Sequence, residues 1–274
     1  MKNDLIKLTR CLKCESSQFN SGVGFYECKN CNHKIEYKNN KLYFSKNFFD
    51  TKTWDGSNLF NFDIFERKTK INMPDIIHGP KIKDLRNYLN LKDSDIAINL
   101  GGGSNKFEKI INFDLGNYDA VDIIGDLENL PFRNDVADLI ISNSVLEHVK
   151  NYEKALYEAK RILKNNGFFY LCVPCVSVRH HKYDFWRWTM PGLVELVENL
   201  NFEIIEKGSC RGPEMMLWYA LETYVVYRTK PGIIREVLRK IALFFAKKFQ
   251  YSPLKKNDKA EALSVTNYVI CKKR

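Results

Sequence analysis

Three consecutive glycines and two carboxylates follow one another in an order that suits an adenosine-bearing ligand. Gly101–Gly103 come directly after the apolar run Ile96–Leu100, so a buried strand is predicted to enter a turn without Cβ atoms. Asp114 and Asp126 each end a further apolar run, and both are expected at strand ends. Taken singly, the glycines suit any tight turn and each acid suits a solvated turn or a helix cap. Their order favours one shared site, and the absence of G-x-G-x-x-G argues against a dinucleotide.

This stretch, through the segment Val145–Val149 (VLEHV), resembles the class I S-adenosylmethionine-dependent methyltransferases, in particular their small-molecule, type 11-like group. The resemblance implies an α/β fold with a doubly wound, mostly parallel, Rossmann-like sheet of seven strands. It also implies S-adenosyl-L-methionine as the cofactor. The cofactor-contacting residues that it implies are Asn99, Gly101, Gly102, Gly103, Asp114, Asp126, Leu127 and Asn143.

The resemblance gives some of these residues a role. Asp114 would hold the ribose hydroxyls, Asp126 would read the adenine amino group, and Leu127 would pack on the ring. Asn99 departs from the family pattern, which has an acid there, and Asn105 replaces a frequent glycine. His148 is interpreted as a structural or ligand-lining residue because it lies at a predicted strand-to-helix junction.

A candidate acceptor-binding loop follows the predicted strand Phe168–Val173. Residues 174–189 are rich in aromatic, histidine and arginine side chains, and ligands of open α/β sheets bind at this edge. His181 is the first candidate for a catalytic base and His180 the second, with Asp184 orienting one of them. The alternative is that one histidine packs or caps and the other is solvated. The candidate substrate-binding residues are Trp186, Arg187 and Trp188, although Arg187 alternatively pairs with a nearby carboxylate.

Two C-x-x-C pairs near the N-terminus predict a structural zinc site. Cys11 and Cys14 form the first pair and Cys28 and Cys31 the second, and four thiolates complete a tetrahedral shell. Two disulfides or a redox motif are the alternatives. No signal peptide is recognised before them, so we expect a cytoplasmic location with reduced thiols.

Positive charge is concentrated at the C-terminal end of the chain. The formal net charge is +10, and residues 207–274 hold 15 Lys and Arg against 5 Asp and Glu. Residues 232–249 have apolar and basic positions at helical spacing, which is typical of a helix lying on an anionic membrane at its inner face. The alternative is that this helix and its predecessor cover the sheet or pair with another subunit. RNA is the other anionic partner considered, and the oligomeric state is left open.

These patterns predict three parts: a zinc ribbon over residues 1–45, a connector over 46–92, and a methyltransferase domain over 93–274. The connector is expected to contain a helix from Pro80 to Leu91. The third part is expected to include a basic helical insertion at 213–250.

The function predicted is methyl transfer from S-adenosylmethionine to a small or carrier-linked acceptor, for example a sugar in surface-polysaccharide assembly. One alternative is an rRNA or tRNA methyltransferase that grips RNA with the ribbon and the basic tail. A second alternative is a binding module that keeps the fold without turnover.

Overall fold

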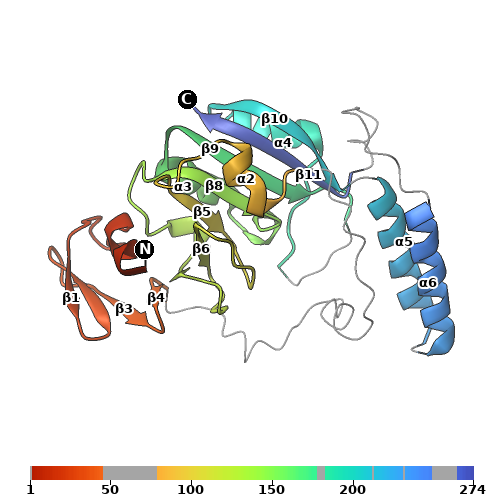
Figure 1. Ribbon diagram of the computed structural model, residues 1–274, viewed down its shortest axis with the longest axis horizontal. Coiled ribbons are helices and arrows are strands. Elements are labelled where there is room, and N and C mark those ends of the chain that lie inside the picture. Colours follow the sequence, from red (N-terminus) through yellow and green to blue (C-terminus); the bar gives the residue numbers. More distant parts are fainter. Residues whose placement is uncertain (1, 46–78, 178–182, 212, 231, 249–263) are drawn as a thin grey trace.

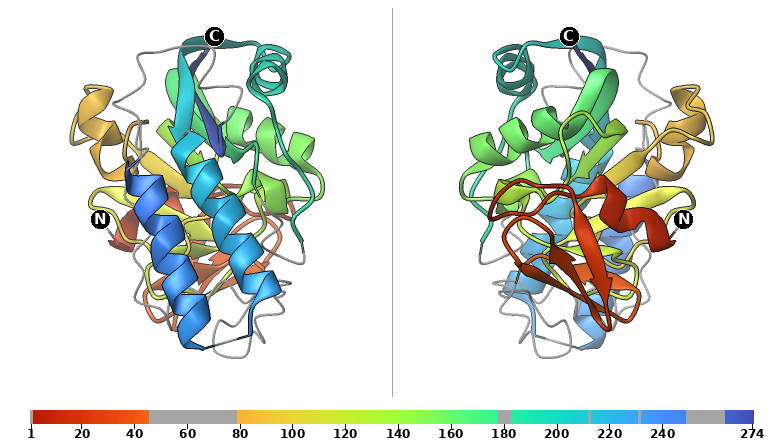
Figure 2. Two further views of the ribbon diagram at one scale, coloured as in Figure 1. Left: turned by 90° about the vertical axis from the view of Figure 1, so that its right-hand side faces the viewer. Right: turned by 90° about the vertical axis from the view of Figure 1, so that its left-hand side faces the viewer.

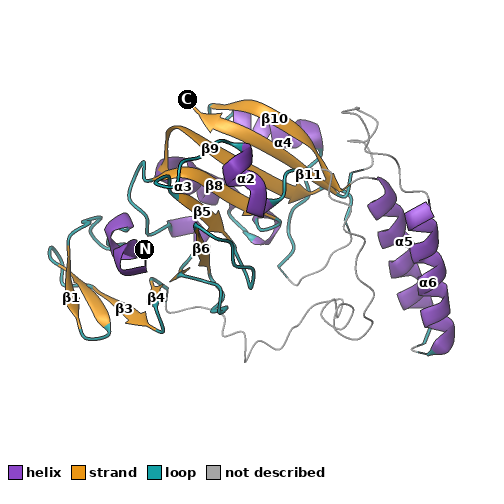
Figure 3. Cartoon of the chain, viewed as in Figure 1, coloured by secondary structure: helices purple, strands orange, loops and turns teal. Residues whose placement is uncertain are grey.

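The computed structural model describes residues 2–45, 79–177, 183–211, 213–230, 232–248 and 264–274. These residues form one mixed sheet with helices on both faces (Figures 1 and 3). The sheet has eleven strands in the described ranges, in the order β1-β2-β3-β4-β7-β6-β5-β8-β9-β11-β10. Seven of them, β5 to β11, lie between residues 97 and 273, as expected for the doubly wound sheet, and four more come from the N-terminal segment.

The centre of the sheet is parallel. Its strands are β5 (Ala97–Leu100), β6 (Ile110–Asp114), β7 (Ile123–Ile124), β8 (Ala137–Asn143) and β9 (Leu163–Pro174). β11 (Thr266–Lys273) is antiparallel to both β9 and β10 (Phe202–Arg211). The strand order reverses between β5 and β8, and ligands of open α/β sheets bind beyond the carboxyl ends of strands at such a switch point.

Helices cover both faces of the sheet (Figure 2). α3 (Tyr152–Ile162) and α4 (Met190–Glu198) lie on one face, and α2 (Leu85–Tyr88) lies on the other. Side chains cap the N-termini of α3 and α4. Asn151 accepts a hydrogen bond from the amide of Lys154, and Thr189 accepts one from the amide of Gly192. The helix expected over Pro80–Leu91 is shorter, a 3-10 turn over Ile82–Asp84 followed by the single turn of α2.

The N-terminal segment adds the four remaining strands to one edge. After a 3-10 helix (Lys2–Leu8), β1 (Phe19–Gly22), β2 (Phe25–Cys28), β3 (Lys34–Lys38) and β4 (Lys41–Tyr43) form an antiparallel meander. β4 then pairs with β7 in parallel, with Leu42 opposite Ile123. The expected seven-stranded sheet is therefore longer because the ribbon segment, residues 1–45, continues it. Residues 46–78 lie outside the description, so the boundaries at 45 and 92 stay predictions.

The basic insertion forms a helical hairpin between β10 and β11. α5 runs over Pro213–Arg228 and α6 over Ile233–Lys248 (Figure 1). The predicted helix over 232–249 thus agrees with α6, apart from residue 249, which is not described. Among the helices within the described ranges, none has the length and apolar character required to cross a bilayer.

Candidate active site

The glycine turn after β5 forms one wall of a cavity of about 600 Å³ at the carboxyl edge of the sheet. Gly101 has φ +71°, and a Cβ there would lie 2.4 Å from Cγ2 of Val145. Gly103 has φ +55°, and a Cβ there would meet no described atom within 4 Å because it would point into open space. Both glycines line the cavity, so their missing side chains leave the backbone open to a ligand.

Asn99 and Gly102 lie behind this turn and do not line the cavity. Nδ2 of Asn99 donates to Oδ1 of the buried Asn112 at 3.1 Å, and Asn112 donates in turn to the carbonyls of Asn105 and Ala120. A Cβ on Gly102 would approach Oδ1 of Asn112 to 2.8 Å. Asn99 and Gly102, both predicted to contact the cofactor, therefore support the turn from behind. The side-chain amides of Asn99 and Asn112 form a pair at the position where the family pattern has an acid.

Asp114, at the end of β6, is held in place by backbone amides. Its Oδ2 accepts from the amide of Gly103 at 2.8 Å and its Oδ1 from that of Gly116 at 2.7 Å. Burial raises the pKa of Asp114, and these amide hydrogen bonds oppose the rise. Each carboxylate oxygen keeps a second lone pair, so the side chain can still accept from ribose hydroxyls.

Asp126 and Leu127 line the same cavity, across from the glycine turn. Oδ1 of Asp126 accepts from the amide of Glu128 at 2.9 Å and begins the 3-10 helix Leu127–Asn129. Asp126 therefore has the capping role that was its alternative, and it also borders the cavity. The structure brings together five of the eight predicted cofactor residues at this cavity: Gly101, Gly103, Asp114, Asp126 and Leu127.

A buried carboxylate adjoins the cavity at the 3-10 helix Leu146–His148. Glu147 is fully buried, and neither of its carboxylate oxygens has a hydrogen-bond partner in the described structure. Burial raises its pKa to about 8, and the nearby charge of Asp184 adds to this. Nε2 of His148, which lines the cavity, lies 3.8 Å from Oε1 of Glu147, and its Nδ1 hydrogen-bonds to the carbonyl of Tyr183 at 2.8 Å. Sequence reasoning identified His148 as a lining residue but missed Glu147, because nothing in its neighbours marks a glutamate as buried.

The predicted acceptor loop lies partly outside the described residues, which exclude both His180 and His181. Their proposed role as bases stays a prediction. The buried side chain of Asp184 forms a bidentate ion pair with Arg187, with Nη2 2.7 Å from Oδ2. Arg187 thus pairs with a nearby carboxylate, which was the alternative to substrate binding. In the described structure Asp184 orients this arginine; whether it also orients a histidine stays a prediction.

The two tryptophans of this loop are fixed against the protein. Nε1 of Trp186 donates to the carbonyl of Val149 at 3.0 Å, and Trp188 is buried in the main core. Both rings pack edge-on against Tyr152 at the start of α3. Among the loop residues that the structure describes, Tyr183 and Phe185 line the cavity instead. Trp188 is thus a core residue, and its assignment to the acceptor is corrected.

A second cavity, of about 290 Å³, lies at the same edge beyond the end of β8. Asn143, predicted to contact the cofactor, lines this cavity and not the first. Ser144 lines both cavities and has φ +55°. Lys81 and Lys83 from before α2 and Arg211 from the end of β10 give the second cavity positive charge. The sequence could not reveal this cavity, since Arg211 lies more than a hundred positions after the two lysines.

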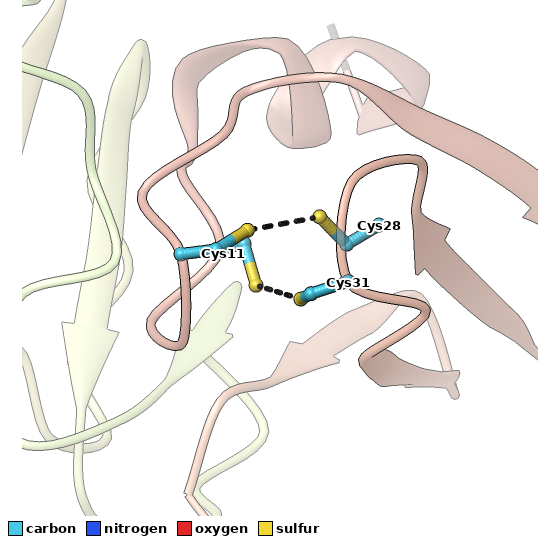
Figure 4. Close-up of side chains that lie close together, drawn as sticks. Cys11, Cys28 and Cys31 are labelled. Atoms are coloured by element: carbon cyan, nitrogen blue, oxygen red, sulfur yellow. Dashed lines mark hydrogen bonds between the residues drawn. The ribbon is translucent and has the colours of Figure 1, made fainter.

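The four N-terminal cysteines converge on one point. Their sulfur atoms all lie within 4.8 Å of one another, with Cys11 3.6 Å from Cys31 and Cys14 3.5 Å from Cys28. Figure 4 shows Cys11, Cys28 and Cys31 turned toward each other. A tetrahedral Zn²⁺ with bonds of about 2.3 Å separates its sulfur ligands by roughly 3.8 Å. The donor set and its spacing therefore fit a zinc ion, and all eight cysteines of the chain are free thiols.

The ribbon segment also contacts the wall of the first cavity. The buried Lys41 at the start of β4 donates from Nζ to Oδ1 of Asn117 at 2.9 Å and to the carbonyl of Tyr118 at 2.7 Å. Tyr118 lines the cavity. Folding of the cysteine-bearing segment and the shape of the ligand cavity are thus physically linked through Lys41, a residue that the sequence analysis did not single out.

Residues 104–171 match a family model described as "Methyltransferase domain". The chain carries a methyltransferase domain. The match confirms the resemblance recognised in the sequence, and its residues include Asp114, Asp126, Glu147 and His148.

Two curated proteins of Methanocaldococcus jannaschii resemble parts of this chain. Uncharacterized protein MJ0638 is 51% identical over 45 residues, which is 16% of this chain and 20% of that protein. Uncharacterized protein MJ1123 is 28% identical over 109 residues, 34% of this chain and 50% of that protein. The chain thus spans half or less of the length of either relative.

Solved structures similar to the methyltransferase domain have low identity to it. A putative methyltransferase from Bacillus halodurans has 15% identity and a TM-score of 0.44, covering 71% of this chain and 99% of that one. Phosphoethanolamine N-methyltransferase 2 from Haemonchus contortus, in complex with S-adenosyl-L-methionine, has 14% identity and a TM-score of 0.45, covering 69% and 51%. The [4+2]-cyclase SpnF has 12% identity and a TM-score of 0.41, covering 70% and 80%.

Proposed function

We propose that this chain binds S-adenosyl-L-methionine in the first cavity and transfers its methyl group to an anionic acceptor in the second. The observation that carries the proposal is the cavity between the glycine turn, Asp114 and Asp126, inside a chain with a methyltransferase domain. Its volume of about 600 Å³ lies within the usual range for small-molecule sites. The cofactor supplies an electrophilic methyl group, and the chain's own residues bind, orient and exclude water.

The two cavities explain how a donor and an acceptor would meet. Ser144 borders both, so ligands in the two cavities would approach each other at the carboxyl end of β8. The left-handed backbone of Ser144 is the kind of strained junction often found at functional sites. Methyl transfer forms one bond from the acceptor atom to the methyl carbon and breaks the bond from that carbon to sulfur.

The acceptor is a small or carrier-linked molecule with negative charge. Lys81, Lys83 and Arg211 all border the second cavity, and arginine and lysine together suit phosphate or carboxylate. A sugar of surface-polysaccharide assembly, carried on a phosphate-bearing group, has this chemistry, and this identity rests on family analogy. For a hydroxyl acceptor, His148 beside Glu147 is a base candidate from the described residues, next to His181 and His180 from the loop.

We also propose that the four cysteines hold a structural zinc ion. The converging sulfurs support it, and the ribbon segment is too small to be stable alone without a metal or the sheet edge that it extends. A cytoplasmic location, where thiols stay reduced, agrees with the eight free cysteines.

Isothermal titration calorimetry with S-adenosylmethionine tests cofactor binding directly. We expect saturable binding to the full chain, and Asp114→Asn should weaken it by about tenfold or more, because an amide NH₂ would face backbone donors and ribose hydroxyls. Asp135→Asn is the matched control, since Asp135 is exposed and pairs with Lys273. No binding by the wild-type chain, or equal loss in both variants, would overturn the assignment of the first cavity.

A screen with methyl-labelled cofactor then tests the acceptor class. Transfer to phosphate-bearing sugars that is lost in Arg211→Gln supports the proposal. Salt-sensitive binding of RNA and transfer to it would establish the RNA methyltransferase alternative. If the chain binds the cofactor but transfers no methyl group to any acceptor class in the screen, the result would favour the second alternative, a binding module without catalytic turnover.

A further inference from the structure

The α5–α6 hairpin projects from the body of the protein. The two helices lie side by side, away from the sheet (Figures 1 and 2), and α5 contacts α6 and the strand β10. α5 buries Trp218 and Val225. The hairpin is therefore a separate surface element, attached to the catalytic part through the strand that ends at Arg211.

Among the side chains of α6 that the structure describes, the one most shielded from solvent is an arginine. Arg239 is only 3% exposed, and its Nη1 lies 3.1 Å from Oε1 of Glu236. Nε of Arg235 donates to Oγ1 of Thr229 at 3.2 Å, across the turn between the helices. A helix of a water-soluble hairpin normally packs its apolar stripe inward and leaves its charges outside. In the described part of α6, by contrast, Arg239 is sheltered and Ile233 and Ile234 are exposed.

Its outward side is a row of large apolar residues. Ile233 is 84% exposed and Ile234 is 74% exposed, and both stand at the start of α6, after the turn between the two helices. The row continues along the helix through Val237, Leu238, Ile241 and Phe244, all of which are exposed. Such a continuous exposed apolar surface marks an interaction site.

Basic residues accompany this row. Arg228, Lys230 and Lys240 are exposed, and residues 207–274 hold 15 basic against 5 acidic residues. A second copy of the hairpin would bring two such basic surfaces together, which is unfavourable. RNA would leave the isoleucines in water. An anionic bilayer can contact both features, because its acyl chains can bury the apolar row and its headgroups can pair with the basic side chains.

We infer that the α5–α6 hairpin docks in the plane of an anionic lipid bilayer, with the apolar row of α6 among the acyl chains. Arg211, at the end of β10 two residues before α5, lines the second cavity, so docking would hold that cavity near the membrane surface. A cavity held near the membrane surface would take acceptors that are carried on lipids. This consequence rests on the proposed methyl transfer. Bilayer docking itself does not, and it can be measured without cofactor.

Vesicle flotation with the full chain tests the docking. Vesicles of phosphatidylcholine alone are compared with vesicles that also contain phosphatidylglycerol. We expect binding to the anionic vesicles that weakens with salt, and Ile233→Ser/Ile234→Ser should lower the partition coefficient by about tenfold or more. Val23→Ser is the matched control, because Val23 is fully exposed on the turn between β1 and β2 and should leave partitioning unchanged.

Lys240→Glu provides a second variant, which should reduce the preference for anionic over neutral vesicles while leaving the melting temperature unchanged. The inference is overturned if wild-type chain does not float with anionic vesicles, or if the double-serine variant floats equally well. A concentration-dependent dimer that the double-serine change disrupts, without flotation, would assign the row to a second copy of this chain. Salt-sensitive RNA binding without flotation would assign the hairpin to RNA.

Discussion

Replacing Glu147 with glutamine should change how the stability of the protein depends on pH. The pKa of the buried carboxyl is raised from 4.5 to about 8, first by burial, with Asp184 adding to the rise and Arg187 opposing it. In the unfolded chain the carboxyl ionises near its ordinary value. Between these two values the folded state therefore holds a proton that the unfolded state has released. The stabilising contribution is complete below about pH 4.5 and is lost as the pH rises through about 8.

The size of the effect follows from proton linkage. One extra proton bound in the folded state lowers the free energy of unfolding by about 1.4 kcal/mol for each pH unit within the window. Glu147→Gln is nearly isosteric with the protonated acid and does not titrate. Both carboxylate oxygens already lack hydrogen-bond partners in the described structure, so the amide should lose little there. We expect similar stabilities at pH 5 and a variant that is more stable by about 2–4 kcal/mol at pH 8.

Urea unfolding at pH 5, 6, 7 and 8 measures this difference. Glu153→Gln is the matched control, because Glu153 is exposed in the first turn of α3 and its removal changes the net charge equally. The reasoning is refuted if wild type and Glu147→Gln show parallel stability curves over this range. A constant offset between them would show that the carboxyl matters for packing but does not hold a proton.

Three further predictions concern the cofactor cavity and the ribbon segment. Lys41→Met should lower the free energy of unfolding by about 1–3 kcal/mol and weaken S-adenosylmethionine binding several-fold in calorimetry, because its two hydrogen bonds hold the loop that carries Tyr118. Removal of zinc by a chelator, or Cys28→Ser, should lower the melting temperature, since the ribbon strands lose their tetrahedral anchor; an unchanged melting curve after verified metal loss would contradict this. Gly101→Ala should cost about 1–2 kcal/mol in strain and abolish measurable cofactor binding, because its Cβ would lie 2.4 Å from Val145; unchanged affinity would exclude the turn from the site.

The convergence of the glycine turn and the two acids at the first cavity was predictable because these parts follow local rules. A short apolar strand, a glycine turn and an acid at the next strand end converge wherever parallel strands share a carboxyl edge. Asp114 and Asp126 could therefore be placed from sequence order alone. The role of Asn99 could not be predicted in this way. Its side chain hydrogen-bonds to Asn112 on the neighbouring strand, and this contact depends on the register between β5 and β6.

Other parts of the site depend on long-range contacts that no local pattern contains. Lys81 from before α2 and Arg211 from the end of β10, the last strand in the sheet order, line the second cavity together although 130 positions separate them in the sequence. Trp188 and Trp186 share an aromatic loop that suggests ligand binding. Their rings instead pack on Tyr152, which the sequence places 34 or more residues away.

The ribbon segment and α6 are two further cases in which the spacing of residues predicts an element but not what that element contacts. Cysteine spacing predicts a metal site, but it does not show that β4 would add to β7 and carry Lys41 to the cofactor loop. Helical spacing over 232–249 predicts an apolar stripe, and such a stripe normally faces the protein. In the described structure Arg239 is instead sheltered beside Glu236 on the same helix, while Ile233 and Ile234 are exposed. An exposed stripe of this kind is unfavourable in water, so the orientation of α6 is itself the strongest reason to look for an apolar phase beside it.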